Sequence, residues 1–190
     1  MTAVVVFMTA LALIPVAAYM YMVRSALGFW PVSISKSPYD MKKKGHKDWH
    51  IWFIVMITDI CAVAWILMRY FPWETGTKVQ IFGGSLIMFA TFLIFCIGIF
   101  TKFVPGEGAG SIVRYWGHMI GSYGGILLGV VALPFAFGLI GLIFSAVFVI
   151  LAALMMWKKK KQGFESMTTW LELLAIVTCI PGIAIGILTI

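Results

Sequence analysis

Residues 115–157 read YWGHMIGSYGGILLGVVALPFAFGLIGLIFSAVFVILAALMMW and contain no charged side chain. As a single helix this segment would be about 65 Å long, because an α-helix rises about 1.5 Å per residue. That length is about twice the ~30 Å hydrocarbon thickness of a bilayer. We therefore predict two membrane-spanning helices, over about 115–133 and 139–157, joined by a hairpin within Pro134–Gly138.

The rest of the chain has the same apolar character. Of its 190 residues, 62% are hydrophobic and 11% are charged, and the mean hydropathy is +1.03. A soluble domain contains about 25% charged residues, so a water-soluble globular fold, a disordered chain and a coiled coil are excluded. The strict alternation of apolar and polar residues typical of an outer-membrane barrel is missing as well. The sequence predicts an all-α, polytopic helix bundle that forms one domain over residues 1–190.

Four further stretches have the roughly 20 apolar residues that a span requires. The first of them begins near the N-terminus, yet it lacks the basic start of a signal peptide and exceeds the usual apolar length of about 7–15 residues. We interpret it as a retained helix with a kink at Pro15. These four predicted helices cover about 3–23, 51–70, 79–100 and 168–190, which brings the total to six.

Basic residues predict the orientation of the six helices. The three loops that follow the first, third and fifth helices hold 12 of the 14 Lys and Arg residues. The opposite side holds only Arg69 and Lys78, so the excess of positive charge places the three loops in the cytoplasm and both termini outside. We expect a multi-pass protein of the cell membrane whose basic loops contact anionic lipid. This topology explains the net charge of +7 without nucleic acid, whose binding motifs are missing. The predicted cytoplasmic loops are 24–50, 101–114 and 158–167.

Asp59 is the least expected residue of the chain, because it lies in the middle of the predicted helix 51–70. An Asp at the centre of a membrane helix costs about 2.5–3.5 kcal/mol. Its neighbours Thr58, Cys61 and Ala62 are small or mildly polar, so we expect this side of the helix to face protein. Two interpretations remain open: a carboxylate that handles protons or cations together with Thr58, or a structural Asp that holds two helices together.

Glu172 is a second acidic residue inside an apolar segment, near the predicted cytoplasmic end of the last helix. Thr168 and Thr169 precede it by four and three residues and therefore share its face. One interpretation is favourable interaction of the acid with the positive end of the helix dipole. The other is a part in proton or cation handling.

Three histidines are candidates for cofactor binding. His46 and His50 are four residues apart and would share a face if that segment were helical, and His118 lies near the start of the predicted helix 115–133. Imidazoles from two helices, such as those of His50 and His118, can hold a haem iron; the same side chains are also suited to a metal or to the head group of a quinone. Ordinary histidines at the membrane boundary are the alternative.

Four glycines of the predicted helix 115–133 recur at strict intervals of four. Such a bare stripe allows another backbone to approach closely. The stripe is typical of a self-associating or pore-lining helix, and equally of packing inside the monomer. Its members are Gly117, Gly121, Gly125 and Gly129.

The predicted loops are too short for a soluble catalytic domain, and hydrolase, metalloprotease and phosphate-binding motifs are missing. We therefore expect a protein without enzymatic activity and without a cofactor, which moves or helps to move a small solute or cation as a channel, an oligomer or a subunit of a membrane complex. One alternative is a redox subunit that binds haem b or quinone through His50 and His118. The other is a structural subunit of a larger membrane complex.

Overall fold

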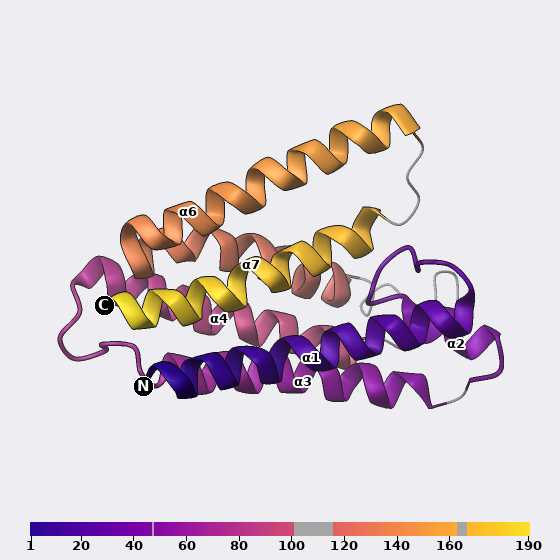
Figure 1. The fold of residues 1–190 in the computed structure, drawn as a ribbon, viewed down its shortest axis with the longest axis horizontal. Coiled ribbons are helices and arrows are strands. Elements are labelled where there is room, and N and C mark those ends of the chain that lie inside the picture. The colour runs from indigo at the N-terminus through magenta and orange to yellow at the C-terminus, as the bar shows by residue number, and fades with distance from the viewer. Residues whose placement is uncertain (47, 101–115, 163–166) are drawn as a thin grey trace.

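All regular secondary structure in the described part of the chain is helical (Figure 1). The computed structural model describes residues 1–46, 48–100, 116–162 and 167–190. Within these ranges the predicted all-α class is confirmed. The elements are α1 (Thr2–Leu27), α2 (Ser37–Lys43), α3 (Trp49–Met68), α4 (Lys78–Phe100), the π-helical turn η1 (Ile120–Gly124), α6 (Gly125–Gln162) and α7 (Met167–Thr189).

Five of the described helical segments are long and apolar enough to cross a membrane. They agree with the prediction of a membrane-embedded helix bundle. One of them is the continuous segment Trp116–Lys158, which has 43 residues and contains the predicted hairpin. The five segments are Thr2–Leu27, Trp49–Met68, Lys78–Ile97, Trp116–Lys158 and Met167–Thr189.

The chain reverses direction inside α6 at Gly138. The backbone there has φ 57° and ψ −128°, a conformation that glycine adopts without the steric cost of a Cβ atom. The Ser145 hydroxyl donates a hydrogen bond of 2.6 Å to the Val130 carbonyl, whereas fifteen residues of uninterrupted helix would separate the two by about 22 Å. The turn thus lies within the predicted segment and divides α6 into a first arm (residues 125–137) and a second arm (residues 139–162), as Figure 1 shows.

The long helices lie side by side in one bundle (Figure 1). The helix α4 packs between α3 and α6, while α7 contacts α6, α1 and α3. Buried side chains from α1, α3, α4, α6 and α7 form one apolar core. The second arm of α6 exposes many large apolar side chains, among them Leu139, Leu142 and Ile150, which is the surface expected of a helix that faces lipid.

The segment that connects α1 to α2 folds over one end of this bundle and is attached to the start of α7. The helix α1 ends at Gly28, whose φ is 81°. Further along, the Thr169 hydroxyl donates to the Pro31 carbonyl at 2.6 Å, and the Thr169 backbone N–H donates to the Val32 carbonyl at 3.1 Å. These two hydrogen bonds bring Ile34, two residues later, next to the first turns of α7.

The structure corrects one feature predicted for the segment 24–50. A short helix, α2, lies where only a loop was expected, and α3 begins at Trp49. His46 therefore precedes the helix that contains His50. Since the two residues are not on one helix, the predicted shared face does not form.

Candidate functional site

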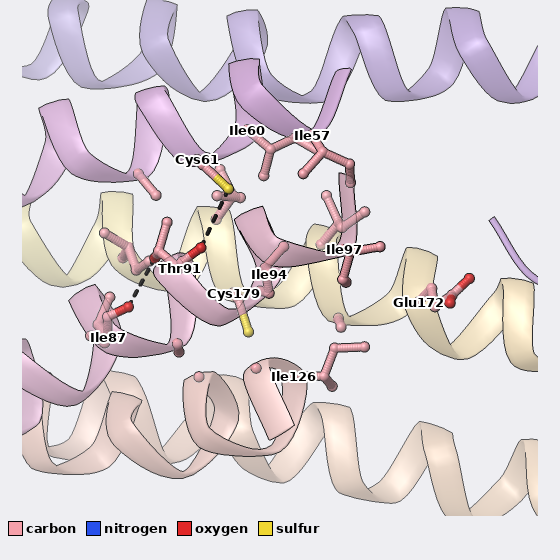
Figure 2. A pocket seen from close by; sticks show the side chains of 18 of the residues that line it. Ile57, Ile60, Cys61, Ile87, Thr91, Ile94, Ile97, Ile126, Glu172 and Cys179 are labelled. Carbon is pink, nitrogen blue, oxygen red and sulfur yellow. Dashed lines mark hydrogen bonds between the residues drawn. The ribbon is translucent and has the colours of Figure 1, made fainter. Parts of the chain in front are cut away.

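A cavity of about 90 Å³ lies inside the bundle, between α3, α4, α6 and α7 (Figure 2). Its wall is almost entirely apolar, and the connection between α1 and α2 closes one end. The lining residues that the following argument uses are Ser35, Cys61, Thr91, Gly129, Glu172 and Cys179.

The middle of the cavity is apolar in its chemistry although it contains polar side chains. The Cys61 thiol contacts the Thr91 carbonyl at 3.5 Å, and the Thr91 hydroxyl donates to the Ile87 carbonyl at 2.8 Å (Figure 2). Both donors are thus directed to backbone carbonyls, as polar side chains inside a membrane commonly are. A molecule in the middle of the cavity would meet mainly isoleucine, alanine and glycine surfaces.

Glu172 forms the polar end of the cavity, apart from the group of Cys61, Thr91 and Cys179 in Figure 2. Its Oε2 atom accepts a hydrogen bond of 2.5 Å from the backbone N–H of Ile34. Its Oε1 atom accepts one of 3.3 Å from the Ser35 hydroxyl. The carboxyl is therefore held by donors from the α1–α2 connection.

His118 continues this polar network on a third segment of the chain. Its Nε2 atom lies 2.9 Å from the Ser35 hydroxyl oxygen and 3.4 Å from that of Ser122. With Glu172 ionised, the Ser35 hydroxyl donates to it. Nε2 of a neutral His118 then carries the hydrogen and donates to Ser35, which leaves Nδ1 as an acceptor. This Nδ1 atom is buried and has no hydrogen-bond partner among the described residues. We call Glu172, Ser35 and His118 the polar cluster.

Asp59 lies apart from the cavity and from the polar cluster. It is partly exposed, and its neighbours Thr58 and Ala62 are exposed, whereas Cys61 is buried; Thr58 and Ala62 therefore face away from the bundle of this chain. The reason is geometrical: Phe53, Ile57, Ile60, Cys61 and Ala64 face the cavity, and at 100° per residue Thr58 and Ala62 lie on the outer side of α3. The Oδ2 atom of Asp59 is nevertheless buried and has no hydrogen-bond partner among the residues that the structure describes.

His46 and His118 lie in different surroundings. His46 is exposed, with its ring 6.3 Å from that of Trp49. Ser35 joins His118 to Glu172, and the Nε2 atom of His118 lies within hydrogen-bond distance of the hydroxyl groups of Ser35 and Ser122. The described residues contain no group of three His, Cys, Asp or Glu side chains that could hold a metal ion.

The glycine stripe packs inside the monomer against α4. A Cβ atom added at Gly121 would lie 2.8 Å from the Leu93 carbonyl oxygen, and one added at Gly125 would lie 2.6 Å from Cγ1 of Ile94. These positions therefore require glycine. Gly129 differs, because a Cβ atom there would lie at an ordinary 3.8 Å from Ala90 and Cys179 and would project into the cavity that Gly129 lines. Gly117 precedes this contact region and is partly buried.

Sequence reasoning missed Ser35, which is central to the polar cluster. It lies in the predicted loop 24–50, where a serine is unremarkable. The one signal available was Ser33-Ile34-Ser35 between Pro31 and Pro38, an irregular polar segment directly after a membrane helix.

Comparison with protein-family models, curated proteins and solved structures finds no match to this chain.

Proposed function

We propose that this chain is an integral membrane protein that binds a small lipophilic molecule within its helix bundle, with the molecule's polar head beside Glu172 and Ser35. The observation that carries the proposal is the cavity of about 90 Å³ whose walls are apolar and whose one end is polar. Ligand sites are commonly apolar pockets with a few polar groups that orient the ligand. An apolar cavity of about 150 Å³ binds benzene in another protein. The cavity of this chain is smaller and is not fully enclosed, so it is suited to a slim alkyl chain or to part of a ring, with the rest of a longer ligand outside it.

Among the functions considered from the sequence, binding of a lipid of the quinone and quinol class is closest to this geometry. His118 acts on the head-group end of the cavity through its contact with Ser35. Glu172 would bind the head group, a role for which the sequence had suggested His50. An apolar wall does not favour the passage of a cation through this cavity, because an unpaired charge is costly to bury. The cavity is therefore better suited to a neutral, lipid-soluble ligand than to an ion.

The proposal includes six membrane crossings with both termini outside the cytoplasm. The reversal at Gly138 supports two crossings within Trp116–Lys158. Residues 1 and 190 lie at the same end of the bundle in Figure 1, as an even number of crossings requires. The basic segment around α2 lies at the opposite end (Figure 1), and the positive-inside rule assigns that end to the cytoplasm of the cell. The polar cluster is then on the cytoplasmic side of the bilayer.

Titration of 4-octylphenol into the protein in lipid nanodiscs, followed by calorimetry, tests the proposal. Empty nanodiscs provide the blank for partition into lipid. We expect saturable binding that Gly129→Ala weakens about tenfold, since an added methyl group in a fitted apolar pocket costs this much or more. Gly124→Ala is the matched control. Its added Cβ atom would also meet only ordinary contacts, at 3.8 Å or more, but Gly124 does not line the cavity.

Two results would contradict the proposal. The first is a titration of the protein that does not differ from that of empty nanodiscs. The second is an equal loss of affinity in Gly129→Ala and Gly124→Ala.

A second candidate function is proton or cation handling by Asp59, separate from the cavity. It is favoured by the buried Oδ2 atom, which lacks a hydrogen-bond partner in the described residues. Ionisable side chains within membrane helices commonly mark ion or proton pathways. On the outer side of α3, such a pathway would run between this chain and a second copy or another membrane subunit.

A further inference from the structure

We infer that the polar end of the cavity selects ligands whose head group donates a hydrogen bond, such as an alcohol, a phenol or a quinol, over ligands that only accept one, such as a quinone, a ketone or an ether. This inference rests on the proposed function, since it names the ligand class of the same site. It follows from counting donors and acceptors in the polar cluster.

The donors of the polar cluster are already used. The N–H group of Ile34 and the hydroxyl of Ser35 each have one hydrogen, and both donate to the carboxyl oxygens of Glu172. The Nε2–H group of His118 is directed to the Ser35 hydroxyl oxygen at 2.9 Å. None of these groups has a second hydrogen to offer a ligand.

In the described part of the chain, the other side-chain donors near the cavity are already used, are weak, or do not line it. The Thr91 hydroxyl donates to Ile87, and the Cys61 thiol is directed to Thr91. The thiol of Cys179 is a weak donor. Trp170 carries a buried Nε1–H without a hydrogen-bond partner in the described residues, but Trp170 is not among the lining residues, and its ring packs against Trp30 with 5.2 Å between centroids.

Glu172, in contrast, can accept further hydrogen bonds. The two oxygens of Glu172 in its ionised form offer about four lone-pair sites, and among the described residues the donors to them come from Ile34 and Ser35. Glu172 and Ser35 both line the cavity. A ligand hydroxyl placed there completes the hydrogen bonding of Glu172, whereas a carbonyl or ether oxygen meets another acceptor and loses its water without compensation.

His118 is a positioning residue in this arrangement. It does not line the cavity, and it acts by holding the Ser35 oxygen so that the Ser35 hydrogen is directed to Glu172. Without His118 the Ser35 hydroxyl is free to rotate and donate to the ligand instead. His118→Phe therefore lowers the preference for donor head groups, while the apolar part of the cavity keeps its shape.

A comparison of three ligands with the same alkyl chain tests the inference. 4-Octylphenol donates a hydrogen bond, its methyl ether only accepts one, and 1-fluoro-4-octylbenzene carries a fluorine of about hydroxyl size with no hydrogen to donate. Affinities are measured in nanodiscs and corrected with empty nanodiscs for partition into lipid. We expect the phenol to bind at least tenfold more tightly than either analogue, as loss of one matched buried hydrogen bond implies.

Glu172→Gln provides the decisive variant, because the amide brings an N–H₂ donor in place of a second acceptor oxygen. We expect the ratio of phenol to ether affinity to fall at least fivefold in this variant. In Gly129→Ala the ratio should stay the same although both affinities fall. The methyl group added at Gly129 would lie 3.8 Å from Cys179, which is seven residues, or about 10 Å along α7, from Glu172; it is therefore expected not to disturb the polar end of the cavity.

The outcomes separate the two proposals. Equal affinity of the wild-type protein for all three ligands overturns the inference but leaves the cavity as a ligand site. Saturable binding of none of them contradicts the proposed function itself. The wild-type comparison decides the inference even if Glu172→Gln does not fold, and an unchanged ratio in a folded Glu172→Gln protein overturns it.

Discussion

Oε2 of Glu172 accepts a hydrogen bond of 2.5 Å from the backbone N–H of Ile34, a residue 138 positions earlier in the chain. This contact joins the first turns of α7 to the connection between α1 and α2. At this end of the cavity, a backbone N–H group and the Ser35 hydroxyl meet the carboxyl group of Glu172. Most of the cavity wall comes from single faces of four helices, but its polar end depends on this one long-range contact and on Ser35 beside it.

Thr169→Val is expected to destabilise the protein by about 1–2 kcal/mol, because it leaves the buried Pro31 carbonyl without its hydrogen-bond donor. Thr169 is fully buried and Val has nearly the same shape, so packing is preserved. The free energy of unfolding of the variant and of the wild-type protein is measured in mixed micelles. Thr168→Val is the control, since Thr168 is only partly buried. Equal stability of Thr169→Val and the wild-type protein would mean that the 2.6 Å hydrogen bond to Pro31 contributes nothing.

Gly121→Ala is expected to lower stability by about 1–3 kcal/mol, the usual cost of forcing a methyl group into a packed contact. The new Cβ atom would lie 2.8 Å from the Leu93 carbonyl oxygen, a backbone atom that cannot move away without shifting α4. Gly124→Ala is matched to it, because Gly124 belongs to the same π-helical turn and its Cβ atom would lie 3.8 Å from the Leu93 side chain. If both variants have the same melting temperature, η1 does not pack on α4 through Gly121.

Labelling of single cysteines with a membrane-impermeant maleimide is expected to place Lys42 and Thr75 on opposite sides of the membrane. Both side chains are exposed, and the proposed topology puts Lys42 in the cytoplasm because of the basic residues around it. Intact cells should therefore label Thr75→Cys at once and Lys42→Cys only after permeabilisation. The unmodified chain is the control for its own cysteines, which are Cys61, Cys96 and Cys179. Labelling of both variants in intact cells would rule out the proposed topology.

Asp59→Asn is expected to fold normally but to abolish proton or cation flux, or its dependence on pH, if Asp59 handles ions. Asn keeps the size and hydrogen bonding of Asp but cannot ionise. Flux into proteoliposomes is compared between the two proteins at matched reconstitution, across about pH 5 to 8. Overlapping curves from two active proteins would leave Asp59 as a structural residue.

The sequence by itself determined the class of this protein and the place of its main turn. Membrane helices are recognised by length and apolar composition, which are properties of consecutive residues. The reversal within Pro134–Gly138 was also predictable from consecutive residues, because a single helix of the 43 residues 115–157 would be too long for one crossing. The glycine stripe was visible for the same reason, since its spacing is local, although only the structure shows that its partner is α4.

Only the tertiary structure decided which side chains form the site. The helices are apolar on all sides, so the sequence pattern does not distinguish the face of α3 that meets protein from the face that meets lipid. For this reason Asp59 was expected to face protein, whereas its neighbours Thr58 and Ala62 are exposed. Ser35 carried no signal of its own, because its role comes from contacts with Glu172, 137 positions away, and with His118, 83 positions away. Such contacts depend on how the helices pack and on the path of the connection between α1 and α2, and neither property is encoded in the spacing of neighbouring residues.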